Sequence, residues 1–175
     1  NSHKGYLREL AEHGIPHVPT VWVDQGDSVD LRQIMAKRGW PDLVIKPAIS
    51  AQARETHFVE ITQVKNGQAK AEALLKHEEL LVQPFLTTVQ THGVMSLIFI
   101  GGEFTHAVIR RPAWGDFRVG TTFGGTVERV RASGEEHHLA RKAVEVITPR
   151  PVVARVDLGQ SEFGELYVMG VEVVQ

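Results

Sequence analysis

The 175-residue sequence contains no cysteine, and this absence excludes disulfide bonds and metal sites built from thiolates. Because disulfides are rare in the reducing cytosol, we expect a cytoplasmic location. No apolar run reaches the length of a membrane-spanning helix, so we expect no membrane partner. The chain also lacks an initial methionine and stops inside an apolar, strand-like run. We therefore expect a fragment of a longer protein, with sequence missing at both ends.

A strong excess of positive charge is also missing, since the formal net charge is −2. Nucleic-acid binders neutralise phosphates with excess lysine and arginine, so we expect no nucleic-acid partner. Hydrophobic residues make up 42% of the chain, which is enough to build a core and argues against disorder.

The first half of the chain alternates segments with strand-like and helix-like patterns of apolar residues. This alternation is typical of a small α/β lobe. The expected strands cover 17–23, 43–46, 57–62 and 80–85, and the expected helices begin near Lys4 and cover 29–38 and 69–79.

The second half has the pattern of an α+β lobe on an antiparallel sheet. Gly101-Gly102 predicts a hairpin within 94–111, and a polar, glycine-rich loop follows up to Gly125. Ser133 and Glu136 form a capping box for a helix, and two strands follow. We expect the lobes to be residues 1–84 and 85–175, with a ligand cleft between them.

The stretch WPDLVIKPAIS places Lys46 directly after the apolar run Leu43–Ile45. Pro47 then ends the strand, because proline cannot donate to a sheet. A lysine at this position is either an edge residue that reaches solvent or a cation held for an anionic ligand.

Asp157 and Glu172 are candidate ligands of a divalent cation. Strand alternation puts Arg155 and Asp157 on one face, and a two-residue turn at Gly164-Glu165 would place Glu172 opposite Asp157. A longer loop is equally compatible with the sequence. Two facing carboxylates repel each other unless a hard cation such as Mg²⁺ lies between them. Arg155 would add a positive charge for phosphate oxygens.

Five motifs occur in an order that resembles ATP-grasp enzymes: VIKPAIS, LLVQPF, AVIRRPAWGDFRV with Gly124-Gly125, ARVDL and VEVVQ. The chain most resembles the branch of glutathione synthetase-like, RimK-like and cycloserine-biosynthesis ligases. Full-length relatives carry an N-terminal substrate domain, and the resemblance implies that this chain lacks it. This resemblance implies an α+β fold in which two lobes with antiparallel sheets hold ATP between them.

The resemblance also implies an ATP- and magnesium-dependent ligase that joins a small-molecule carboxylate to an amine or thiol. Such enzymes form an acyl phosphate and release ADP and phosphate. Mn²⁺ is an alternative metal, and the relatives' frequent oligomers allow a homo-oligomer.

The resemblance assigns each matching residue a role. The residues that would contact the nucleotide are Lys4, Lys46, Ser50, Thr56, Gln83, Pro84, Phe85 and Leu86. The catalytic arginines would be Arg155, Arg118 and Arg111, with alternation allowing only one of Arg110 and Arg111 to face the cleft. The metal ligands would be Asp157, Glu172 and Gln175.

Two departures from the family's pattern motivate an alternative function. The loop after Lys46 contains no glycine, and Val94 stands where many relatives have an acidic residue. The alternative is a non-catalytic nucleotide-binding or assembly module with the same fold.

Overall fold

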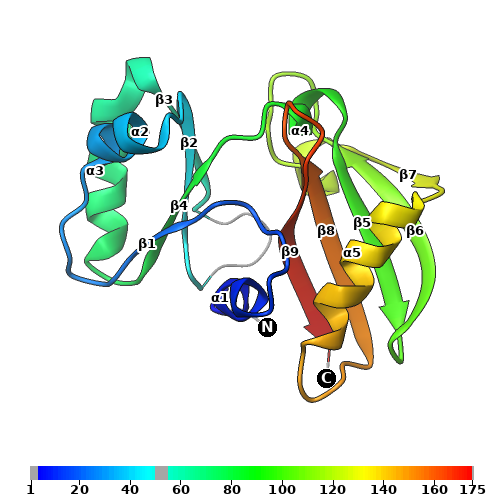
Figure 1. Cartoon of the computed structure of the whole chain (residues 1–175). Helices are drawn as coiled ribbons and strands as arrows, with labels where there is room; N and C mark the ends of the chain where they lie inside the picture. The colour runs from blue at the N-terminus through cyan, green and yellow to red at the C-terminus, as the bar shows by residue number, and fades with distance from the viewer. Residues whose placement is uncertain (1–3, 50–54, 175) are drawn as a thin grey trace. The chain divides into compact units, whose positions relative to one another are not determined.

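The computed structural model describes residues 4–49 and 55–174 and divides into two compact units (Figure 1). The first unit contains Lys4 and Val18–Phe85. The second unit contains Gly5–His17 and the described residues from Leu86 onward. Both units combine helices with an antiparallel sheet, as the family resemblance implied.

The first unit is built on a four-stranded sheet with the order β1-β4-β2-β3, in which all neighbours are antiparallel. Its strands are β1 (Val21–Val23), β2 (Asp42–Pro47), β3 (His57–Glu60) and β4 (Leu80–Pro84). Its helices are α2 (Leu31–Arg38), the 3-10 helix η1 (Ile61–Gln63) and α3 (Val64–Leu75). The α/β expectation for this half was wrong. Helix α3 connects β3 to β4, but β2 lies between these two strands and makes every neighbouring pair antiparallel.

The core of the first unit forms between this sheet and its two longer helices, and α3 approaches the sheet closely. Val59 of β3 and Leu75 of α3 are both buried. Gly67 allows the close approach, because a Cβ atom there would lie 2.4 Å from Cγ1 of Val59. Helix α3 begins at Val64, five residues before its expected start.

The second unit is built on a five-stranded antiparallel sheet with the order β7-β6-β5-β8-β9. The strands are β5 (Val94–Ile100), β6 (Glu103–Arg111), β7 (Thr126–Val130), β8 (Val153–Gln160) and β9 (Leu166–Val174). The helices are α1 (Tyr6–Glu12), α4 (Thr88–Thr91), η2 (Thr121–Phe123) and α5 (Gly134–Glu145). The Gly101-Gly102 hairpin is confirmed, with both glycines at positive φ. Strand β7 was not predicted, because four of its five residues are exposed and no apolar pattern marks it.

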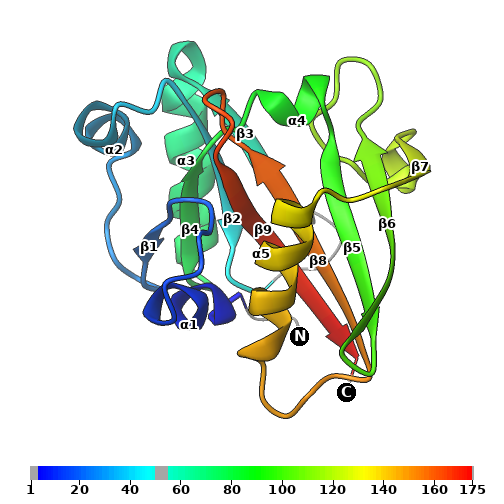
Figure 2. The same ribbon diagram turned by 45° about the vertical axis from the view of Figure 1, so that its right-hand side comes forward.

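Helix α5 covers one face of this sheet, as Figure 2 shows, and leaves the opposite face for charged side chains. The predicted capping box is present, with Ser133 and Glu136 each bonding the other's backbone N–H. Phe99 lies on the covered face and packs against His137 of α5. We call the opposite face the site face. It carries Ser96, Arg110, Arg155, Asp157 and Glu172.

The expected pairing of Asp157 with Glu172 was wrong. Asp157 lies opposite Gly170, and Arg155 lies opposite Glu172. The turn is longer than two residues, and a β-bulge at Met169 shifts the register between Asp157 and Leu158. The bulge also moves Val168 off the face that Gly170 and Glu172 share, because one inserted residue reverses the alternation.

No helix among the described residues has the length and apolar character needed to cross a membrane.

Candidate functional site

Asp157 is the centre of a hydrogen-bonded network on the site face of the second unit. Its side chain is 13% exposed. Oδ1 accepts hydrogen bonds from the Ser96 hydroxyl at 2.7 Å and from Nε of Arg155 at 3.0 Å. Oδ2 accepts from Nη2 of Arg155 at 3.0 Å and from Nη2 of Arg110 at 2.8 Å. Two guanidinium groups therefore compensate the charge of this buried carboxylate.

Arg155 lies between the two candidate metal ligands. Its Nη2 also donates to Oε1 of Glu172 at 2.6 Å. Burial opposes the charged form of Arg155, but the carboxylates of Asp157 and Glu172 raise its pKa overall. No hydrogen bond joins its Nη1 to another described residue, so that nitrogen is available to an anionic ligand.

Arg110, and not Arg111, faces this network. Nε of Arg110 donates to the Ser96 hydroxyl at 2.8 Å while Nη2 pairs with Asp157. Arg111 points to the other face, where its exposed side chain pairs with Glu128 at 3.0 Å. The structure thus brings together Arg155, Asp157 and Glu172 of the predicted residues and leaves Arg111 apart.

Two residues of the site, Ser96 and Tyr6, were not predicted from the sequence. Ser96 is fully buried within an apolar strand, and a lone buried hydroxyl in such a run is the signal that could have found it. The Tyr6 hydroxyl accepts a hydrogen bond from the backbone N–H of Val171 at 3.0 Å. Burial is the main reason why the pKa of Tyr6 rises to about 12. Tyr6 thereby holds β9 beside Glu172.

Lys46 lies at the end of β2 in the first unit, and the structure brings Lys4 near it. The backbone N–H of Lys4 donates to the carbonyl of Ala48 at 2.8 Å. Burial, together with the positive charge of Lys4, lowers the pKa of Lys46 to about 7. Two ammonium groups held near each other are stabilised by an anion that contacts both.

The segment Gln83–Leu86 contains the boundary between the units, since the first unit ends at Phe85. Strand β1 pairs with β4 only up to Val82, so Gln83 and Pro84 pair with β2 alone among the described strands. The buried Gln83 amide donates to the Thr20 hydroxyl at 2.8 Å, and Phe85 packs on Phe58. Side-chain contacts therefore hold this segment in place. On the side that faces away from β2, the backbone groups of Gln83 and Pro84 pair with no described strand.

Arg118 belongs to the loop between β6 and β7, and its guanidinium contacts other residues of the same loop. It pairs with Asp116 at 2.7 Å and lies 3.8 Å above the ring of Phe123. The hydrogen bond from Arg118 is the main reason why the pKa of Asp116 falls to about 2. Thr56 precedes β3 and is half-buried, whereas Ser50 and Gln175 lie outside the described residues.

The oxygen donors of Asp157 and Glu172 fit a magnesium site. Mg²⁺ is usually held by one or two carboxylates together with substrate phosphates and water. Glu172 lies diagonally from Asp157 on the adjacent strand, and Arg155 bonds both carboxylates. Within residues 4–49 and 55–174, no group of three or more histidine, aspartate or glutamate side chains could hold a metal ion. Phosphate oxygens would therefore have to complete the coordination.

Comparison with known proteins matches the RimK-like ATP-grasp domain to residues 6–173. A probable alpha-L-glutamate ligase of Xanthomonas campestris is 30% identical over 158 residues, which cover 90% of this chain and 52% of that protein. The cycloserine biosynthesis protein DcsG of Streptomyces lavendulae is 28% identical over 109 residues, covering 60% of this chain and 36% of that protein. The chain thus spans about half, or less, of these curated relatives.

Solved structures show the same fold. The D-cycloserine synthetase DcsG superposes with a TM-score of 0.88 at 23% identity, covering 99% of this chain and 62% of that one. A D-alanine–D-alanine ligase from Bacillus anthracis gives 0.74 at 16% identity, covering 98% and 56%. The ligase PsnB, solved with a minimal precursor, Mg and ADP, gives 0.68 at 17% identity, covering 95% and 47%.

Proposed function

The chain belongs to the RimK-like ATP-grasp family, and from this premise we propose that it is the ATP-binding part of an ATP- and magnesium-dependent ligase. Its relatives are named as ligases, which supports C–N bond formation. In the proposal, a carboxylate oxygen attacks the γ-phosphorus of ATP and ADP leaves. An amine or thiol then attacks the acyl carbon of the resulting acyl phosphate, loses a proton and releases phosphate. A cytoplasmic location would supply the ATP.

The position of Arg155 is the observation that carries the proposal. Its guanidinium bonds both carboxylates and keeps Nη1 available, so it can donate to an oxygen of the transferring phosphoryl group. Positive donors that are already fixed in place stabilise developing charge without reorganising during the reaction. Asp157 supplies that fixation, because it is itself held by Ser96 and Arg110.

The remaining residues divide into phosphate, adenine and metal contacts. Lys46 and Lys4 would bind phosphate oxygens as positive charges, and the uncovered backbone of Gln83–Leu86 would bind the adenine edge. Asp157 and Glu172 would hold Mg²⁺, which neutralises phosphate charge when it is bound. Arg110 takes the role that the sequence assigned to Arg111, because it is Arg110 that reaches Asp157.

Isotope transfer tests the reaction in the full-length protein. Candidate substrates labelled with ¹⁸O in the carboxylate are incubated with ATP, Mg²⁺ and hydroxylamine as a general nucleophile. We expect ADP, a hydroxamate and phosphate that carries one ¹⁸O atom. Formation of AMP and pyrophosphate would contradict the proposal, because the acyl group would then be activated as an adenylate.

The non-catalytic module is the second candidate, favoured by the buried, apolar Val94 opposite Arg110. It predicts tight Mg-ATP binding and no ¹⁸O transfer with any substrate, including in the full-length protein. Because both candidates require ATP binding, turnover is the measurement that separates them.

A further inference from the structure

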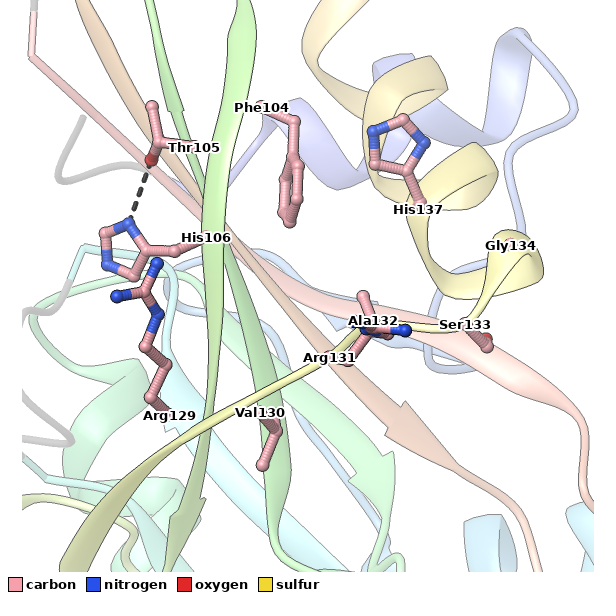
Figure 3. Close-up of a pocket in the computed structure, with 10 residues that line it drawn as sticks. All are labelled: Phe104, Thr105, His106, Arg129, Val130, Arg131, Ala132, Ser133, Gly134 and His137. Atoms are coloured by element: carbon pink, nitrogen blue, oxygen red, sulfur yellow. Dashed lines mark hydrogen bonds between the residues drawn. The ribbon is translucent and has the colours of Figure 1, made fainter.

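A basic hollow lies at the outer edge of the five-stranded sheet, within the second unit (Figure 3). It has a volume of about 610 Å³, in the range of small-molecule sites. Four of its ten lining residues are basic and none is acidic. The basic residues are His106, Arg129, Arg131 and His137.

The hollow forms where β7 stops covering β6. The last pair between these strands joins Val130 to Ala107, so Phe104–His106 have no strand partner on that side within the described chain. Backbone groups at such an uncovered edge can bond a ligand. On the covered face of the sheet, the wall is aromatic, because Phe104 packs edge-on against His137 at 4.9 Å between ring centroids.

His106 and Arg129 project on the same side of β6, as Figure 3 shows. Arg129 lies opposite Val108, which makes it a diagonal neighbour of His106. Glu128, the acid next to Arg129 in sequence, is engaged by Arg111. No ion pair joins Arg129 or Arg131 to an acid within the described chain. Uncompensated positive charge around a hollow favours an anionic ligand.

The hydrogen bonds of Thr105 orient His106. The Thr105 hydroxyl donates to the carbonyl of Ile98 at 3.1 Å, so its oxygen accepts from Nδ1–H of His106 at 2.9 Å. Nε2 is then the nitrogen that remains for a ligand, and it donates to a carboxylate when the ring is in the protonated, imidazolium form.

His106 lies on the site face, which is the face of the sheet that carries the proposed reaction centre. Ile98 pairs with both Arg155 and His106, so His106 is two strands away from Arg155. Two strand spacings are about 10 Å. A substrate whose reacting carboxylate lies at Arg155 could therefore place a second group at His106.

From these observations we propose that His106 and Arg129 bind a second, non-reacting carboxylate of the ligase's substrate. This inference rests on the proposed function for the identity of the ligand. A bidentate guanidinium–carboxylate pair gives both charge and direction to such recognition.

Histidine NMR tests the inference with glutarate as the probe, glutaramide as its uncharged analogue, and inorganic phosphate as the alternative anion. The His106→Gln variant assigns the signal of His106. We expect glutarate to shift this signal saturably, glutaramide to leave it unchanged, and Arg129→Gln to weaken glutarate binding at least about tenfold. Arg32→Gln, which removes an arginine from α2 of the other unit, should bind glutarate like the wild type.

Equal responses to glutarate and glutaramide, an unchanged affinity in Arg129→Gln, or no saturable shift would overturn the inference. Tighter binding of phosphate than of glutarate would also overturn it, in favour of a phosphate site. The remaining histidine signals report whether each variant is folded. Mg-ATP titration of the wild type is measured separately, so failure of the glutarate site alone leaves the proposed function intact.

Discussion

At the scale of single residues, substitutions of the adjacent Arg110 and Arg111 test which of the two arginines belongs to the site. Arg110→Gln removes a charged donor from the buried Asp157, which should lower the free energy of unfolding by about 1–3 kcal/mol. It should also weaken Mg-ATP binding. Arg111→Gln removes an exposed pair and should change stability by less than about 0.5 kcal/mol. Denaturant unfolding and calorimetric ATP titration measure both effects. Equal losses in the two variants would refute the assignment of Arg110 to the site.

The lowered pKa of Lys46 predicts a pH dependence of nucleotide binding. With a pKa of about 7, the free side chain is mostly neutral above pH 7, whereas a bound phosphate favours the charged ammonium form. ATP binding should therefore take up a proton, and affinity should fall by up to about tenfold per pH unit above pH 7. Titrations between pH 6.5 and 9 in buffers of different ionisation enthalpy measure both quantities.

Lys46→Arg is the matched control, because a guanidinium stays charged throughout this range. Its affinity should be nearly flat with pH. If the wild type is equally flat, or if the variant keeps the slope, Lys46 does not contact the phosphates as a titrating group.

The identity of the charged residues was readable from the sequence, but their partners were not. Alternation placed Arg155 and Asp157 on one face correctly, since period 2 is a local property of a strand. It could not choose between Arg110 and Arg111, because that choice depends on which face α5 covers. Ser96 was missed for the same reason.

At the scale of elements, the β8–β9 pair shows where sequence patterns stop being informative. Both strands were predicted, yet the Met169 bulge and the longer turn moved Glu172 from Asp157 to Arg155. A one-residue insertion reverses the side-chain alternation beyond it. Gly170, which directly follows Met169, is the residue in this stretch that could have indicated the bulge. The exposed edge strand β7 was missed because edge strands need no apolar alternation.

Two helical glycines should respond in opposite ways to substitution by alanine. Gly67→Ala should destabilise the protein by about 1–3 kcal/mol, because the new Cβ would overlap Val59 at 2.4 Å. Gly134→Ala, in the first turn of α5, meets nothing within 4 Å and should stabilise by up to about 1 kcal/mol. Denaturant unfolding measures both. Adding Val59→Ala should recover part of the Gly67→Ala loss, and a stabilising Gly67→Ala would show that α3 does not approach β3 this closely.

At the scale of the whole molecule, the proposed function requires complementary groups from the two units. The first unit supplies a pair of lysines, and the second supplies an arginine flanked by two carboxylates. Neither set alone would provide phosphate contacts, a metal site and a donor for the transferred group. The order of motifs along the sequence was sufficient to recognise the family.

A double-mutant cycle tests whether both units act on one nucleotide. Lys46→Ala and Asp157→Asn should each weaken Mg-ATP binding, the first by removing a phosphate contact and the second by removing a metal ligand. If both residues act on the same phosphates, the losses should be non-additive by more than about 0.5 kcal/mol, although the residues belong to different units. The matched cycle of Lys46→Ala with Arg111→Gln should be additive within that limit. Additive losses in the first cycle would mean that the two sets of residues act independently, and the assignment of both sets to one ATP-grasp reaction centre would then be wrong.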